Sequence, residues 1–389
     1  MAISQNFPNE SPTLVLNFAS SRKLDPRITF TRSSIATYVD EDKLIKTARI
    51  NEARFDHDPV TGECKGLLIE EDRTNLITQS NTDVEFSNAS TGNTWTSSES
   101  APDGSLTAKI CTTNNRSFKE YTSSSVNAVV STFSIYLKWT GSIGVSTVRT
   151  FDLRDISSDT VRTTSSITLT NNWQRFSISG TVQSNGIRVE ISGGISSVSA
   201  WGAQLEVGSF PTSYIPTSGS TVTRFGDLAF IDIKPNSWYN YSQGSLVFQH
   251  SLVPYATGAL PGYPAVGFAQ TNGSSSNSIQ YFFTKNGGGA QYLVRDSGVD
   301  QTTLDVSGGT GSGVIASKVG FSYATNSFIV ARNGSQVGVT TSGVVPQSIG
   351  TLLLGTNSKN STNNINACIS NVVYYSKSLS SSRLQNLTK

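Results

Sequence analysis

The stretch WGAQLEVGSFPTSYIPTSGSTVTR, residues 201–224, joins an apolar segment to a proline-containing one. Apolar side chains occupy alternate positions in its first half, which predicts a strand with one buried face. These residues are Trp201, Ala203, Leu205 and Val207. The strand is expected to end at Gly208, and Pro211 and Pro216 follow it. Because proline fixes φ and has no N–H to give to a sheet, residues 211–224 predict an extended connector between two β domains.

The same two-residue period recurs through most of the chain. Apolar and polar residues alternate in 133–139 and in 187–191, and turn sequences such as Asn185-Gly186 separate such segments. This pattern is typical of half-buried antiparallel strands. A short helix is expected after Ser380, which has the side chain of a helix cap. The sequence therefore predicts an all-β protein.

Strand patterns and turn signals divide the 389 residues into a small N-terminal β domain and two antiparallel β-sandwich (jelly-roll) domains. The predicted parts are an N-terminal region at 1–80, a first sandwich at 81–210, a Pro/Ser/Thr linker at 211–224 and a second sandwich at 225–389.

Composition argues against several classes of partner. Charged residues make up 14% of the chain, and 29 Lys and Arg against 27 Asp and Glu leave a net charge of +2 without a basic cluster. Since clustered cations supply most nucleic-acid affinity, no nucleic-acid partner is expected. No segment approaches about 20 apolar residues, so membrane insertion is not expected either. The start, MAISQNFPNESP, lacks the basic and apolar regions of a signal peptide and predicts synthesis in the cytoplasm.

Residues that commonly carry metal or nucleophilic chemistry are sparse. His57 stands between two aspartates, whose carboxylates are expected to accept its N–H, and His250 lies within a strand pattern. Both are predicted to be structural. The acidic residues around His57 depart from the spacing of a calcium loop, and no G-x-S-x-G motif occurs, so no cofactor or metal is expected. Three widely separated cysteines are expected to be reduced thiols: Cys64, Cys111 and Cys368.

Paired carboxylates are the alternative that would support catalysis. Glycoside hydrolysis needs two carboxyl groups roughly 5–10 Å apart, and Glu70 and Asp72 share one side of a predicted strand. They precede Arg73, so a salt bridge or an interdomain contact is the favoured interpretation. The chain also lacks the repeat pattern of a parallel β-helix. We therefore do not expect an enzyme.

Saccharide binding needs aromatic faces and neutral hydrogen-bonding groups, and the sequence contains both. Aromatic residues in loop-like contexts are the candidate ligand contacts, with core packing or a subunit interface as the alternative for each. These candidates are Trp95, Trp238, Tyr239, Tyr241, Tyr255 and Tyr263. Three other tryptophans fit strand patterns and are predicted to lie in the core: Trp139, Trp173 and Trp201.

Particular phrases also resemble known families. Near the N-terminus, LNFASSRKLDPRITFTRSSIATYVDEDKLI (16–45) and RFDHDPVTGECKGLLIEEDRTNLITQS (54–80) resemble a segment that recurs in fibre and spike proteins of tailed bacteriophages, including cyanophages. The phrase WGAQLEVG resembles the end of carbohydrate-binding-module-like jelly rolls in tail-fibre and head-fibre proteins. The C-terminal NVVYYSKSLSSSRLQNL (371–387) resembles laminin-G and concanavalin A-like sandwiches.

This resemblance implies a subunit of a phage virion fibre or spike, displayed on the virion surface and often a homotrimer. The N-terminal region would attach to another virion protein, such as a tail or capsid adaptor, or pack the trimer. The expected function is binding of a host surface glycan without catalysis. Two alternatives remain open: a structural capsid or tail decoration fibre with little receptor role, and a polysaccharide depolymerase.

Overall fold

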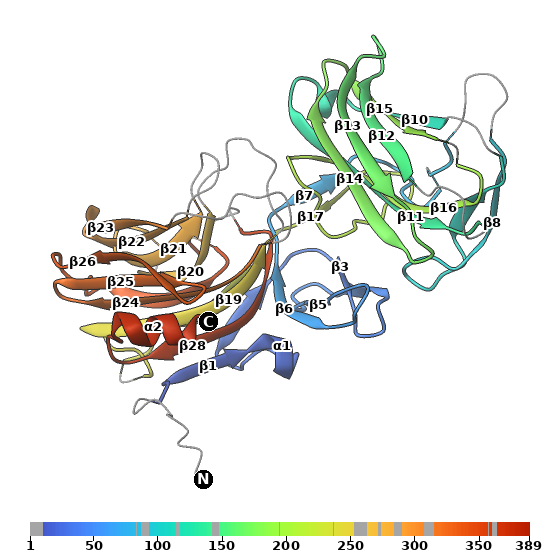
Figure 1. Cartoon of the computed structure of the whole chain (residues 1–389). Coiled ribbons are helices and arrows are strands. Elements are labelled where there is room, and N and C mark those ends of the chain that lie inside the picture. Colours follow the sequence, from blue (N-terminus) through green and yellow to red (C-terminus); the bar gives the residue numbers. More distant parts are fainter. Residues whose placement is uncertain are drawn as a thin grey trace.

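The computed structural model shows two β-sandwiches side by side (Figure 1). It describes residues 11–82, 84–86, 93–113, 117–141, 148–193, 195–235, 237–252, 263–270, 274–283, 290–306, 315–356, 358–359 and 364–389. Nearly all of the regular structure is strand, and the paired strands of these residues run antiparallel. The predicted all-β fold class is confirmed.

The middle of the chain forms the first sandwich. Its strands are β8 (Trp95–Glu99), β9 (Ala108–Cys111), β10 (Ser117–Thr122), β11 (Val130–Trp139), β12 (Val148–Asp155), β13 (Val161–Thr168), β14 (Gln174–Thr181), β15 (Gly186–Ser192) and β16 (Val198–Val207). One sheet has the order β14-β11-β16-β9-β8, and the other has the order β10-β15-β12-β13. Inward-facing residues such as Phe133, Phe151 and Val189 form the core between the sheets, as the alternating pattern predicts.

The second sandwich combines strands from both ends of the chain. From the N-terminal region come β1 (Leu14–Asn17), β2 (Ile28–Thr31), β5 (Phe55–His57) and β6 (Cys64–Ile69). The others are β18 (Leu228–Asp232), β19 (Gln243–Leu252), β20 (Tyr263–Gln270), β21 (Ser278–Phe283), β22 (Ala290–Asp296), β23 (Val299–Val306), β24 (Ile315–Ala324), β25 (Ser327–Arg332), β26 (Ser335–Thr340), β27 (Ile349–Leu354) and β28 (Ala367–Tyr375). The sheet orders are β26-β25-β24-β19-β28-β6-β5, with β1 also on β28, and β2-β18-β27-β20-β21-β22-β23.

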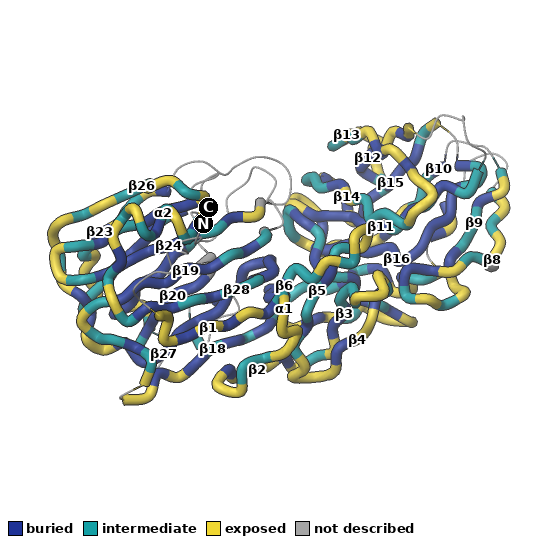
Figure 2. The backbone as a smooth tube through the Cα atoms, turned by 60° about the horizontal axis from the view of Figure 1, so that its bottom comes forward, coloured by how far each residue is buried: buried dark blue, intermediate teal, exposed yellow. Residues whose placement is uncertain are grey.

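This pairing differs from the predicted division into three consecutive domains. Most N-terminal strands complete the sheets of the C-terminal sandwich: β1 and β6 both pair with β28, and β2 pairs with β18. Leu16 and Ile69 are buried in the same core as Phe248. Figure 2 shows β6 and β28 buried where they meet. Alternation along a sequence predicts a strand and its buried face, but it does not identify the strand's partner.

Four short strands lie between the two sandwiches: the hairpin β3 (Ala36–Val39) and β4 (Ile45–Ala48), and the pair β7 (Arg73–Asn75) and β17 (Val222–Arg224). The helix α1 (Phe18–Ser21) packs instead on β6 and β28, with Phe18 in the core of the second sandwich. The predicted linker at 211–224 is packed rather than free. Tyr214 and Ile215 are buried within it, and the Asn75 amide donates to the Ile215 carbonyl at 2.9 Å. Pro211 and Pro216 indicate that the chain leaves a sheet here, but they do not predict whether the connector packs against its neighbours.

The C-terminal helix α2 (Ser381–Leu387) matches its prediction. The Ser380 hydroxyl accepts from the Arg383 N–H as an N-cap, and Leu384 is buried together with Val247 and Tyr375 of the eight-stranded sheet. Within the described residues, neither helix combines the length and the apolar character needed to cross a membrane.

A β-bulge in β16 places Trp201 on the opposite face of the strand from Ala203, although the alternation at 201–207 predicts one shared face. The pairing of β16 with β11 shifts register near Gly202, whose φ is +64°. Ala203 and Leu205 therefore face the core of the first sandwich, whereas Trp201 faces the other way and packs 4.6 Å, centroid to centroid, from Tyr214. Trp201 is buried as expected, but it lies against the connector.

Gly66 in β6 is predicted to be indispensable for the junction of β6 with β28. Its φ is +110°, and a Cβ there would lie 2.2 Å from the Ile369 carbonyl oxygen. Gly66→Ala should lower the free energy of unfolding by about 2 kcal/mol or more relative to Gly298→Ala, measured by urea denaturation. Gly298 is a matched control, because its φ is +83° and nothing lies within 4 Å of its Cβ position. Equal losses for the two variants would contradict the packing argument.

Candidate functional site

A buried ion network lies where the connector meets the N-terminal strands. Arg54 donates to Glu70 Oε2 at 2.6 Å and to Asp227 Oδ2 at 2.6 Å. Arg32 reaches Asp227 Oδ1 at 2.9 Å, and Arg224 Nε lies 3.5 Å from Glu70 Oε2. All five side chains are at most 2% exposed. Charges this deeply buried require partners on several sides, because desolvation alone would strongly destabilise them.

Backbone and neutral groups complete the network. Glu70 and Asp227 exchange hydrogen bonds, with the Glu70 N–H donating to Asp227 Oδ2 and the Asp227 N–H to the Glu70 carbonyl, both at 2.9 Å. Ser213 of the connector donates its N–H and its hydroxyl to the Glu70 carboxylate at 2.7 and 2.6 Å. The connector is therefore held by the ionised side chain of Glu70, the residue that directly follows β6.

This arrangement bears on the predicted carboxylate pair. Burial disfavours ionisation of Glu70, but Arg224, Arg54 and the Ser213 hydrogen bonds outweigh it and lower its pKa to about 2. A general acid needs the opposite shift. The predicted salt bridge is confirmed for Glu70, although its partners are Arg54 and Arg224. Arg73 instead pairs with Glu71 at 2.6 Å, and Asp72 accepts from the Gly226 N–H.

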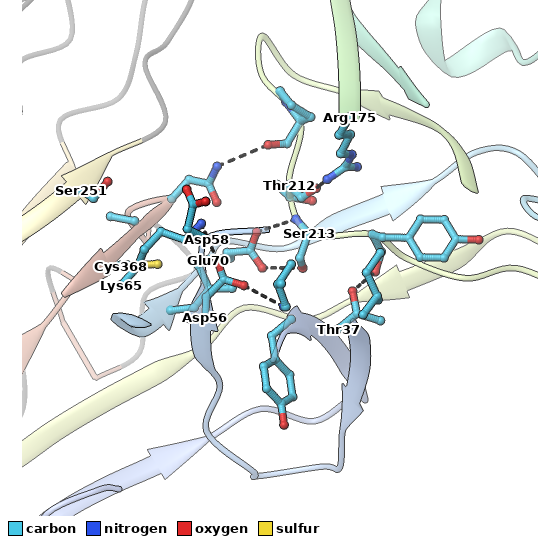
Figure 3. Close-up of a pocket in the computed structure, with 18 of the residues that line it drawn as sticks. Thr37, Asp56, Asp58, Lys65, Glu70, Arg175, Thr212, Ser213, Ser251 and Cys368 are labelled. Carbon is cyan, nitrogen blue, oxygen red and sulfur yellow. Dashed lines mark hydrogen bonds and ion pairs between the residues drawn. The ribbon is translucent and has the colours of Figure 1, made fainter. Parts of the chain in front are cut away.

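A pocket of about 400 Å³ opens beside this network, between the two sandwiches (Figure 3). It is lined by the hairpin strand β3, strands β5 and β6 with their turn, strands β11 and β14, connector residues 211–214, and the adjoining ends of β19 and β28. Its volume is within the usual range for small-molecule sites. The lining residues come from segments far apart in the sequence, between Thr37 and Cys368.

Aromatic rings form part of its lining. Tyr38 comes from β3, Tyr136 from β11 and Tyr214 from the connector. Tyr136 meets Trp201 and Tyr214 edge to face, at centroid distances of 5.6 and 6.4 Å. Burial raises the pKa of Tyr136, so its hydroxyl stays neutral and can both donate and accept a hydrogen bond.

Acidic groups line the wall formed by β5 and the turn after it. Asp56 pairs with Lys65 at 2.9 Å and accepts from the Val39 N–H at 2.8 Å. Asp58 accepts the N–H groups of the turn residues that follow it, and the N–H of Thr61 is the main cause of its lowered pKa. Both carboxylates are thus oriented acceptors.

The two histidines have structural positions. His57 is buried with Nδ1 3.0 Å from the Val39 carbonyl, so the prediction that a flanking carboxylate would be its partner is wrong. His250 is fully buried beside Phe248 and Phe283, and burial followed by the charge of Arg332 lowers its pKa to about 3. The three cysteines are free thiols. Among the described residues, no group of three or more His, Cys, Asp or Glu side chains could hold a metal ion.

The four sequence-predicted aromatic contacts whose side chains are described do not belong to this pocket's lining. Trp95 is half-buried against the first sandwich and donates from Nε1 to the Phe86 carbonyl at 2.8 Å. Trp238, Tyr239 and Tyr241 form one cluster on the core of the second sandwich, with Tyr239 6% exposed and the other two half-buried.

The side chains of the remaining two candidates are not described. Tyr255 lies outside the described residues, and only the backbone of Tyr263, in β20, is described. Of the three tryptophans predicted for the core, Trp139 is buried and Trp173 is half-buried beneath Lys138.

Comparisons with known proteins add little. No protein family and no curated protein matches this sequence. Solved structures with partial similarity include the CBM40 module of Ruminococcus gnavus IT-sialidase bound to α2,6 sialyllactose, with 17% identity, a TM-score of 0.31, and 39% of this chain and 85% of that chain covered.

Two further structures show similarity of the same order. The NanB sialidase of Streptococcus pneumoniae has 14% identity and a TM-score of 0.31, with 38% of this chain and 24% of that chain covered. The binding domain of botulinum neurotoxin serotype D has 15% identity and a TM-score of 0.32, with 42% and 40% covered. Similarity this low carries no argument about function.

Glu70 is predicted to make stability depend on pH in acid. Its folded-state pKa of about 2 is below the ordinary 4.5, so its contribution is complete above pH 4.5 and is lost as pH falls towards 2. Between pH 5 and 2, the free energy of unfolding of the wild type should fall by about 3 kcal/mol more than that of Glu70→Gln. At neutral pH, Glu70→Gln should cost about 3–5 kcal/mol.

Urea denaturation at several pH values measures both effects. Glu120→Gln provides the control, because Glu120 is 37% exposed in its pair with Arg188. Parallel pH curves for the wild type and Glu70→Gln would contradict the assignment of Glu70 as a buried, ionised anchor.

Proposed function

We propose that this protein binds a surface glycan without catalysis, and that the saccharide occupies the pocket between the two sandwiches. The observation that carries the proposal is the pocket's mixed lining of tyrosine rings, oriented carboxylates and hydroxyl or amide groups. Aromatic faces stack on the C–H groups of a sugar ring, and polar groups fix the orientation of its hydroxyls. Asp56 and Asp58 supply acceptors, whereas Thr212 and Asn366 supply further polar side chains.

The rigidity of the site supports a binding role. The ion network fixes the connector, and Thr212 is held by the Glu206 carboxylate, to which it donates both its N–H at 3.1 Å and its hydroxyl at 2.5 Å. Gln204 also holds the connector by accepting the Ile215 N–H at 2.6 Å. A preformed pocket loses little conformational entropy when a ligand binds.

We propose further that the chain is a subunit of a phage fibre or spike, displayed on the virion surface and attached to other virion proteins. The support is the resemblance of residues 16–45 and 54–80 to such proteins. A homotrimer would present three copies of the site, so that weak contacts with a host glycan become strong together.

The junction pocket and the sequence-predicted aromatic residues make different predictions about glycan binding. Tyr38→Ala should weaken binding of the full chain to purified host lipopolysaccharide about tenfold, because a stacking face of the pocket is removed. Tyr241→Ala is a matched comparison: a half-buried tyrosine of the second sandwich, outside the pocket. Biolayer interferometry measures both affinities. If only Tyr241→Ala weakens glycan binding, the binding site is the aromatic cluster of the second sandwich and not the pocket. If the wild type shows no saturable binding, the proposed function is wrong.

Trimerisation is predicted separately. Light scattering at micromolar concentration should give three times the mass of one chain, 41.6 kDa. A mass of one chain would contradict the trimer and leave the pocket proposal intact.

A further inference from the structure

Arg175, on β14 of the first sandwich, is held in place on one wall of the junction pocket. Its guanidinium donates from Nη1 to the Thr212 carbonyl and from Nη2 to the Ser134 hydroxyl, the latter at 2.9 Å. The guanidinium carbon lies 5.5 Å from the centroid of the Tyr136 ring. Two hydrogen bonds and a cation–π contact therefore orient a charge that the pocket exposes to a ligand. Figure 3 shows Arg175 reaching the connector at Thr212, opposite the elements that carry Asp56 and Lys65.

Among the described residues, no acidic side chain neutralises Arg175. Within the part of the chain that the structure describes, no carboxylate oxygen lies within 4.0 Å of its guanidinium nitrogens. The other cations at the junction differ, since Arg54 has two carboxylate partners and Lys65 has Asp56. Arg175 Nε is also buried without a hydrogen-bond partner. A guanidinium has five N–H donors, and those of Arg175 have two acceptors among the described residues.

The opposite wall has a different character. Asp56 is already compensated by Lys65, and Asp58 by backbone N–H groups, so neither can neutralise Arg175 across the pocket. Their remaining lone pairs can accept from hydroxyl groups. Among the residues that line the pocket, Arg175 is thus an uncompensated cation at one side and the two aspartates are hydroxyl acceptors at the other, and tyrosine rings also belong to the lining.

We infer that the pocket selects a saccharide that bears a carboxylate, such as a uronic acid residue, and that Arg175 binds the carboxylate. This inference rests on the proposed function. The carboxylate pairs with the planar guanidinium, the sugar hydroxyls donate to Asp56 and Asp58, and the ring packs against tyrosine. A sugar phosphate fits less well, because its second negative charge would face the two aspartates with no cation left to compensate it.

The test uses the full chain on a glycan array that carries uronic acid oligosaccharides and neutral oligosaccharides. Binding confined to the acidic members is the expected result. Any bound acidic oligosaccharide is then reduced at its carboxyl groups to the neutral sugar, which changes only the group that Arg175 is inferred to bind. The affinity should fall about tenfold or more, as expected for a lost charge-assisted hydrogen bond.

Variants assign the effect to Arg175. Arg175→Gln should bind the acidic and the reduced oligosaccharides equally, and Arg175→Lys should keep part of the preference because it keeps the charge. Arg295→Gln is the control, since Arg295 pairs with Asp300 on the second sandwich and does not belong to the pocket lining. Thermal denaturation of each variant shows whether the connector remains docked.

The outcomes separate the two proposals. Equal binding of acidic and reduced oligosaccharides by the wild type would overturn the inference and leave glycan binding standing. Binding only to neutral oligosaccharides would do the same. Binding to no saccharide would remove both the inference and the proposed function.

Discussion

A buried ion network holds the junction between the two sandwiches, and its members are Arg32, Arg54, Glu70, Arg224 and Asp227. Three cations and two anions are removed from water at one point, so each charge must be met by several neighbours. Those neighbours come from the N-terminal strands, from the connector and from the start of the C-terminal sandwich. The network therefore specifies one arrangement of three chain segments. The network also fixes one wall of the adjacent pocket, because Glu70 belongs to both.

Local patterns predicted the strands well, and their limits appear at particular residues. Alternation at 133–139 and 187–191 corresponds to β11 and β15, and Ser380 caps α2 as expected. The alternation at Trp201 failed, because one left-handed glycine inserts a bulge and reverses the face of the tryptophan. The place of β1 and β6 beside β28 could not be predicted, because pairing between strands this far apart in the sequence, as Leu14 and Tyr374 are, leaves no local pattern.

The candidate site was less predictable than the fold. In the sequence, Asp56 and Asp58 indicated only a turn, and Glu70 was noted only for its closeness to Arg73. The long-range partners of Glu70 were not apparent. Tyr136 and Arg175 occupy ordinary strand positions. A usable signal was present in the charges that interrupt apolar stretches, such as Arg32 after Phe30 and Glu70 after Ile69. A charge at the end of a buried strand needs a buried partner, and such partners gather where segments meet.

The pairing of β1 and β6 with β28 has a consequence for biosynthesis. The ribosome makes β1 and β6 early and their partner β28 much later, with the entire first sandwich in between. The first sandwich, formed by one continuous segment, can fold while the chain is still growing. The edges of β1 and β6 that pair with β28 stay open until β28 has been made, and unpaired edges of this kind are prone to aggregation. The middle sandwich is in this sense an insertion, entered through β7 and left through β17, and the host domain that surrounds it is completed only after the insertion has been made.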